Sequence, residues 1–239
     1  MKYLQHLVII TVLAILVLGC ANQTPSTLHS LTVAVDLSEA DGFRPKADFI
    51  LDRLESDNIF DGIEISYIPI IDTRYTERHA FTLSKSSAGW LSNEDSRRRS
   101  RRALSTQFRD TLAKYCVNDK PLKYSAIFGT IVTELNRLAS KQGVRKLILI
   151  SDLKEHSPIF SIYDPRQARR LLKYPKDVQA RFESMVRLAD NYKGINVELI
   201  HLPSPEEEQH FSAMVALYRA VIESRGGTLT IGNQKTVKL

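Results

Sequence analysis

Hydrophobic residues along this chain alternate between short, nearly continuous runs and longer segments in which they recur every three or four positions. The short runs predict buried β-strands, because a strand that is covered on both faces carries few polar residues. We expect strands at residues 31–35, 63–71, 146–150, 195–202 and 228–231, and an antiparallel edge strand at 78–84. Pro69 indicates an end or edge position within the second of these strands.

The periodic segments predict the helices that connect the strands. Helical stripes of apolar residues run through residues 44–55, 126–140 and 205–226, and residues 166–192 form one helix or two, divided at Pro175. Ser92, followed by Asp95, approximates a capping box at the start of a further helix. The alternation predicts an α/β fold of three layers, doubly wound around a mostly parallel sheet.

The first twenty residues have a different pattern. Lys2 precedes an apolar run from Leu7 to Leu18, which is too short to span a bilayer as a helix and is typical of a secretory signal. The motif that ends at Cys20, Val-Leu-Gly-Cys, resembles the lipobox of bacterial lipoproteins, in which the chain is cleaved before the cysteine and the cysteine carries the lipid. A plain signal peptide and an uncleaved anchor are the alternatives.

The resemblance to lipoproteins divides the chain into three parts: a signal peptide at 1–19, a lipidated N-terminus and tether at 20–30, and one domain at 31–239. Ala21 and Asn22 stand where an inner-membrane retention signal has aspartate, so we expect an outer-membrane lipoprotein that faces the periplasm. Removal of residues 1–19 takes away Lys2 and no acid, which lowers the formal charge from +6 to +5. Positive charge favours anionic lipid surfaces, peptidoglycan or nucleic acid as partners. A secreted lipoprotein has little access to nucleic acid, so we expect no nucleic-acid partner.

One basic cluster stands out, formed by Arg97, Arg98, Arg99, Arg101 and Arg102. These residues lie in the first turns of a predicted helix, where the helix dipole disfavours cations. The cluster is either a solvated helix face or a contact with an anionic surface. Cys116, the second cysteine, is expected to be a small buried residue.

Two predicted strands end in acids, at Asp36 and Asp152. Ligands collect at the carboxyl ends of the strands in an open α/β sheet, so these carboxylates meet at one edge if their strands are neighbours. Hard divalent cations such as Mg²⁺ bind carboxylates, hydroxyls and water. The sequence therefore predicts a site for Mg²⁺ or another divalent cation, and the alternative is a pair of strand-end acids that hydrogen-bond to loop amides.

The segments VAVDLSEA, SAIFGTI and LILISDL occur in the order and approximate spacing seen in von Willebrand factor A domains. The resemblance implies that fold, with an antiparallel edge strand, and a metal-ion-dependent adhesion site. By this resemblance Asp36, Ser38, Ser125 and Asp152 hold the metal, with Thr130 as the alternative to Ser125. Two positions depart from the family pattern, because Ala40 replaces the second serine and Leu153 replaces the usual glycine.

These observations lead us to expect a lipid-anchored envelope protein that binds an unidentified envelope protein, as an adaptor in an envelope assembly. The alternatives are a metal-independent structural lipoprotein that contacts peptidoglycan or phospholipid, and a metal-assisted hydrolase that uses Asp36 and Asp152. Nucleophile elbows, Walker loops and zinc-protease motifs are absent from the sequence, so we assign no catalytic residue and do not expect an enzyme.

Overall fold

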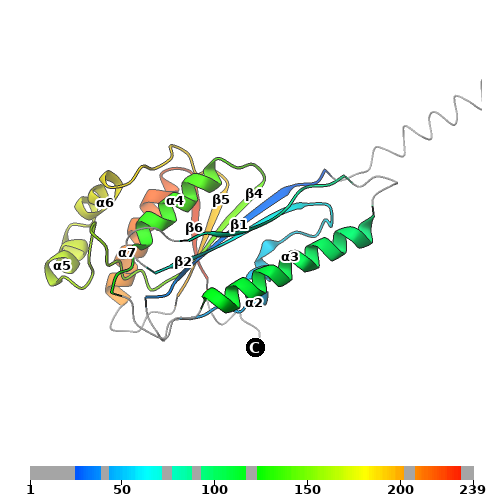
Figure 1. Ribbon diagram of the computed structural model, residues 1–239. Coiled ribbons are helices and arrows are strands. Elements are labelled where there is room, and N and C mark those ends of the chain that lie inside the picture. Colours follow the sequence, from blue (N-terminus) through cyan, green and yellow to red (C-terminus); the bar gives the residue numbers. More distant parts are fainter. Residues whose placement is uncertain are drawn as a thin grey trace, which may run out of the picture.

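A six-stranded sheet, in the order β3-β2-β1-β4-β5-β6, runs through the centre of the molecule (Figure 1). This computed structural model describes residues 25–38, 43–71, 77–87, 93–116, 123–201 and 208–232. The predicted signal peptide, Cys20, Ala40 and Ser92 lie outside these residues.

Five of the strands are parallel, namely β1 (Leu28–Asp36), β2 (Gly62–Ile70), β4 (Val144–Ile150), β5 (Ile195–Ile200) and β6 (Thr228–Gly232). The sixth, β3 (His79–Leu83), pairs antiparallel with β2 at one edge. This arrangement confirms the predicted α/β fold with its single antiparallel edge strand. β1 lies between β2 and β4, so Asp36 ends a central strand.

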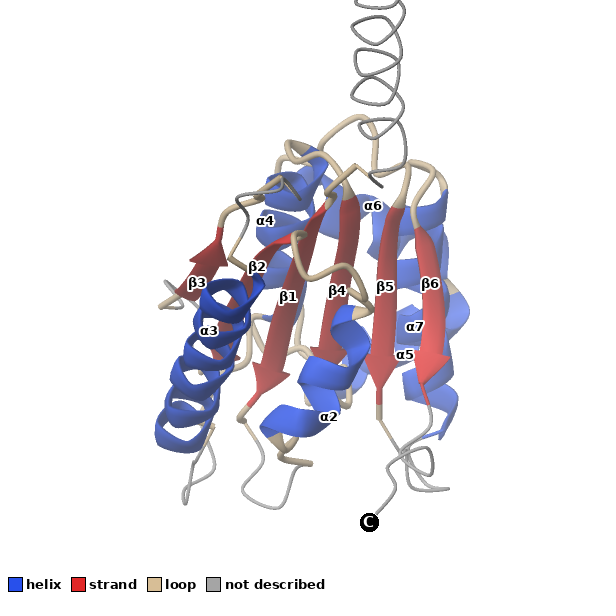
Figure 2. Ribbon diagram, turned by 90° about the vertical axis from the view of Figure 1, so that its right-hand side faces the viewer, coloured by secondary structure: helices blue, strands red, loops and turns tan. Residues whose placement is uncertain are grey.

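Helices cover both faces of the sheet (Figure 2). One face packs against α4 (Ile127–Ala139), α5 (Pro165–Lys173), α6 (Pro175–Ser184) and α7 (Glu208–Glu223). The other packs against α2 (Ala47–Leu51), which continues as a 3-10 turn at Asp52–Leu54, and against α3 (Glu94–Tyr115). Among the described residues, no helix is long and apolar enough to cross a membrane.

Several predicted boundaries shift for physical reasons. The helix expected at 44–55 is reduced to α2 and its 3-10 turn, and Asn93 caps α3 by accepting a hydrogen bond from the Ser96 amide at 2.8 Å. The helical segment at 166–192 does divide, because Pro175 begins α6. Pro69 is tolerated inside β2 because β3 pairs only as far as Tyr67, which leaves β2 without its outer neighbour at the proline.

Two arginines of the basic cluster hold the loop that enters β2. Arg97 donates from Nε to the Ile59 carbonyl at 3.0 Å. Arg101 donates from Nη2 to the carbonyl and hydroxyl oxygens of Ser56, at 3.1 and 2.6 Å. These guanidinium groups therefore donate hydrogen bonds to loop carbonyls that lie outside the strands of the sheet. In this way they attach α3 to the loop that enters β2.

We expect Arg101→Ala to lower the free energy of unfolding by about 2 kcal/mol, because hydrogen bonds from a charged donor are lost together. Urea denaturation measures this change. Arg102→Ala is the matched control, since Arg102 is exposed one position further along the same helix, and it should change stability by less than about 0.5 kcal/mol. Equal effects of the two substitutions would contradict this role of Arg101.

Candidate functional site

The Asp36 carboxylate lies at the carboxyl edge of the sheet, where it joins three segments of the chain. Its side chain is buried, with the residue 8% exposed. Oδ1 accepts hydrogen bonds from the Ser38 amide at 3.0 Å and from the Ser125 hydroxyl at 3.1 Å. Oδ2 accepts from the Ser151 hydroxyl at 2.9 Å. The carboxylate thus fixes the loops that follow β1 and β4 and the segment that leads into α4.

Ser125 is held in this position by backbone pairing as well. Its amide and carbonyl exchange hydrogen bonds with those of His156, at 3.0 and 2.9 Å, in an isolated β-bridge. The structure therefore brings Ser125 against Asp36, 89 positions away in sequence. Thr130, the alternative to Ser125, donates its hydroxyl hydrogen bond to the Ala126 carbonyl within α4.

Asp152 follows β4 at the same edge, where it contacts Lys154, two residues along the chain. Oδ1 accepts from the Lys154 amide at 2.9 Å, and Oδ2 lies 3.1 Å from the Lys154 ammonium. Asp152 thus already has a cationic neighbour supplied by the chain. Within the described part of the chain, no group of three or more His, Cys, Asp or Glu side chains converges on one point.

Leu153 keeps the backbone conformation that a glycine would adopt. Its φ of 60° lies in the left-handed region, although its side chain is 1% exposed. A non-glycine residue in this region costs about 1–2 kcal/mol, so the surrounding loop must hold it there. The Leu153 amide donates to the Ser151 hydroxyl at 2.9 Å, which ties this strained residue to the Asp36 network.

Glu155 is a buried acid that the sequence analysis did not select. It is 0% exposed, and its Oε2 accepts from the Phe128 amide at 2.9 Å, in the first turn of α4. The α4 N-cap, Ala126, offers no side-chain acceptor, and a carboxylate near a helix N-terminus is favoured by the dipole. The predicted helix at 126–140 begins one residue too early, and because Ala126 is the observed N-cap, another residue must supply the cap.

Burial raises the pKa of Glu155 to about 7, and the charge of Asp36 adds to this increase. Hydrogen bonds from Ser157 and from the α4 amides act in the opposite direction and do not offset it. Two carboxyl groups, Asp36 and Glu155, therefore influence each other beneath the edge of the sheet. Only the first of them is a predicted site residue.

The side chains present have the chemistry that a divalent cation requires. Asp36 and Ser125 supply a carboxylate and a hydroxyl in direct contact, and Ser38 lies two residues along on the same loop. Such oxygen donors suit Mg²⁺. Lys154 opposes a cation at Asp152, because its ammonium already lies beside that carboxylate.

The remaining predicted residues lie elsewhere. Arg97 and Arg101 are bound to the loop before β2, whereas Arg98, Arg99 and Arg102 are exposed on α3. Arg98 pairs with Glu94 at 3.5 Å. Cys116 is buried, as expected, and burial raises the pKa of its thiol.

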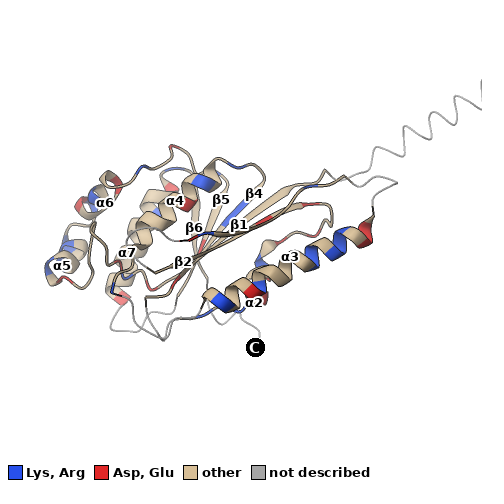
Figure 3. Cartoon of the chain, viewed as in Figure 1, with Lys and Arg blue, Asp and Glu red and all other residues tan. Residues whose placement is uncertain are grey.

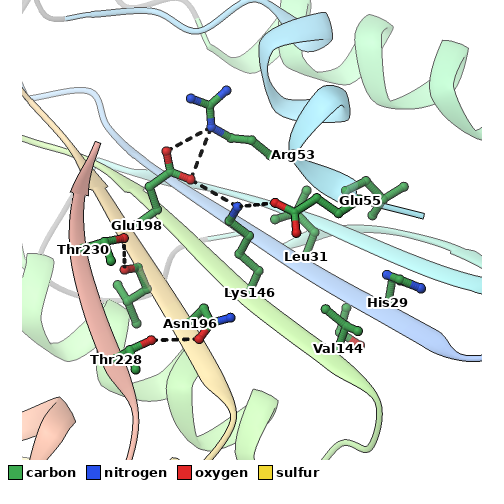
Figure 4. A pocket seen from close by; sticks show the side chains of 13 residues that line it. His29, Leu31, Arg53, Glu55, Val144, Lys146, Asn196, Glu198, Thr228 and Thr230 are labelled. Atoms are coloured by element: carbon green, nitrogen blue, oxygen red, sulfur yellow. Dashed lines mark hydrogen bonds and ion pairs between the residues drawn. The ribbon is translucent and has the colours of Figure 1, made fainter. Parts of the chain in front are cut away.

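A hollow of about 330 Å³ lies on the sheet face that α2 covers in part, at the first halves of β4, β5 and β6 (Figure 4). Its charged side chains pair with one another. The Glu198 carboxylate forms ion pairs with Arg53 at 3.1 Å and with Lys146 at 3.3 Å. Lys146 also forms an ion pair with Glu55 at 3.3 Å. Because these charges are mutually satisfied, we interpret this hollow as a structural polar network and assign no ligand to it.

Comparisons with known proteins give the fold little further support. No protein family model matches the chain, and no curated protein matches it. A crystal structure of the human COPII-coat protein Sec24c is similar, with a TM-score of 0.43 and 12% identity. The match covers 90% of this chain and 30% of that chain. The observed strand order, and not this likeness, therefore carries the fold assignment.

The raised pKa of Glu155 predicts how stability depends on pH. Between the ordinary value of 4.5 and about 7, the folded state binds this proton more tightly than the unfolded state. This contribution to the free energy of unfolding is therefore fully present below pH 4.5 and falls by up to about 3 kcal/mol as pH rises to about 7.

Urea denaturation at pH 5 and pH 8 measures this dependence. Glu155→Gln should reduce the loss of stability between these two pH values, because the amide cannot ionise. Glu208→Gln, at an exposed position of α7, is the control and should leave the loss unchanged. A wild-type loss that persists in full in Glu155→Gln would show that other groups cause it.

Proposed function

We propose that this chain is a protein-binding module that uses the carboxyl edge of its sheet and holds a divalent cation there. The observation that carries the proposal is the 3.1 Å hydrogen bond between Ser125 and Asp36, two buried residues from distant segments. A carboxylate and a hydroxyl held together in this way form a preorganised part of a hard-cation site.

In this proposal Asp36, Ser38, Ser125 and Asp152 hold Mg²⁺ or a similar cation. The cation would supply a positive charge to which a carboxylate of the partner protein binds. The buried Asp36 carboxylate supplies negative charge at the edge, which favours a cation beside it. Ala40 contributes no hydroxyl, so water would complete the shell.

We further propose that Cys20 carries a lipid and that the domain faces the periplasm from the outer membrane, as part of an envelope assembly. β1 begins at Leu28, so the last three residues of the tether predicted at 20–30 belong to the sheet, and in this proposal the tether ends before Leu28. The proposal assigns no catalytic residue to the protein. It rests on the sequence motif at Cys20 and on the fold downstream of it.

One observation favours a second candidate, a metal-independent structural lipoprotein. Both carboxylates have partners within the chain, because Asp36 accepts from Ser125 and Ser151 and Asp152 pairs with Lys154. In this candidate the edge is a structural network, and any contact with peptidoglycan or phospholipid uses the exposed arginines of α3.

Thermal unfolding with Mg²⁺, with Mn²⁺ and with a chelator separates the two candidates. A cation at a hundred times its dissociation constant should stabilise the wild type by about 2.7 kcal/mol. Asp36→Asn, which keeps the side-chain shape, should abolish the shift. Lys154→Ala should lower the cation concentration that is needed, because it removes the competing ammonium.

Asp95→Ala, which removes an exposed acid at the start of α3, is the matched control and should keep the full shift. Circular dichroism establishes that each variant is folded. A wild type that melts at the same temperature with cation and with chelator would overturn the metal-dependent proposal. A shift that survives in Asp36→Asn would place the cation elsewhere.

A further inference from the structure

Helices α5 and α6 form a hairpin at one end of the molecule (Figure 1). They meet at Tyr174 and Pro175, and both pack against α7. α5 turns Ala168 and Leu171 toward the core. Its opposite face is exposed and carries only cations among its charged residues, namely Arg166, Arg169, Arg170 and Lys173 (Figure 3).

A hollow of about 400 Å³ opens between the two helices. It is lined by the four cations of α5 together with Tyr174 and Asp177. The cations therefore surround a concave surface on which a ligand can contact several of them at once.

These cations have few acidic partners. Within the described residues, an ion pair of α5 joins Arg170 to Asp177 at 3.5 Å. The Asp164 carboxylate, which caps α5, accepts from the Arg166 amide at 2.8 Å and so lies near one further cation. Arg169 donates to the Pro165 carbonyl, and Lys173 lies 5.4 Å from the centre of the Tyr174 ring. By contrast, Arg53, Arg78 and Lys141 on the body of the domain all pair with acids. The hairpin thus keeps positive charge that the fold does not neutralise.

Large apolar side chains are exposed on the same two helices. Tyr174, which lines the hollow, is 51% exposed, and Leu172 of α5 and Met185, the C-cap of α6, are 43% and 57% exposed. Arginine, tyrosine and methionine are the residue types enriched at protein–protein interfaces, where lysine is depleted. A guanidinium also binds a carboxylate through two parallel hydrogen bonds, which an ammonium cannot do.

We propose that the hollow between α5 and α6 binds an acidic segment of a partner protein. Carboxylates of that segment pair with Arg166, Arg169 and Lys173, and its apolar side chains contact Leu172 and Tyr174. A guanidinium binds phosphate as it binds carboxylate, so the observation that favours a protein over a lipid headgroup is the exposure of Tyr174 and Leu172 beside the cations. The hairpin also lies at the end of the molecule opposite the start of β1 (Figure 1), so it points away from the attachment point of the tether.

This inference does not depend on a cation at Asp36. The hairpin follows the loop that carries Asp152, and Figure 2 places α5 toward the end of the sheet to which the strands point. The hollow between α5 and α6 therefore provides a second contact surface near the proposed binding edge. Failure of one surface would leave the other unaffected.

Fluorescence anisotropy with a labelled (Glu-Gly)5 peptide containing one central tyrosine tests the proposal on the full chain. We expect saturable binding that weakens as salt is raised, because exposed charges are screened. A variant in which three charges of α5 are reversed should bind the peptide about tenfold more weakly or worse. It combines Arg166→Glu, Arg169→Glu and Lys173→Glu. The matched control reverses three charges of α3 and should change the affinity less than about twofold. It combines Arg98→Glu, Arg99→Glu and Arg102→Glu.

Two further variants separate specific docking from general attraction. Tyr174→Ala keeps the net charge and should weaken binding about threefold, because an exposed aromatic contact is lost. Asp36→Asn should bind the peptide as the wild type does, and its loss of binding would assign the peptide to the other site.

Three results would overturn the proposal. The first is an equal loss of binding in the two triple reversals, and the second is no binding of the peptide at low salt. The third is binding of the protein to phosphatidylglycerol vesicles under conditions in which it does not bind the peptide. The last result would identify the hairpin as a membrane contact.

Discussion

The carboxylate of Asp36 is the contact on which the edge of the sheet depends. It accepts hydrogen bonds from Ser38, Ser125 and Ser151, and in this way joins the chain after β1, before α4 and after β4. A buried carboxylate is unfavourable unless such donors surround it. The three segments and the charge therefore stabilise one another.

The same contact explains the features around it. Leu153 stays in the left-handed region because the loop is held on both sides, by Ser151 against Asp36 and by His156 against Ser125. Glu155 completes the arrangement by capping α4 from outside the helix. Backbone strain and a buried acid at one edge are features that folds tolerate where a surface is used for binding.

Much of the fold could be predicted from the sequence, because strands buried on both faces are near-continuous in apolar residues. The runs that end at Asp36 and Asp152 gave the central strands, and Pro175 gave the division between α5 and α6. Contacts between distant side chains could not be predicted in this way. Arg101 holds a loop through Ser56, which is 45 positions away in sequence. The pairing of Lys154 with Asp152 is local but depends on the rotamers of both side chains, which the pattern of apolar residues does not specify.

The proposed binding of a partner carboxylate at the edge of the sheet requires a divalent cation there. Anomalous diffraction from crystals of the protein grown with Mn²⁺ tests this directly. We predict one anomalous peak bounded by Asp36, Ser38 and Ser125, with the Lys154 ammonium displaced from Asp152. A map with no peak at the edge, in which Lys154 remains beside Asp152, would contradict the account.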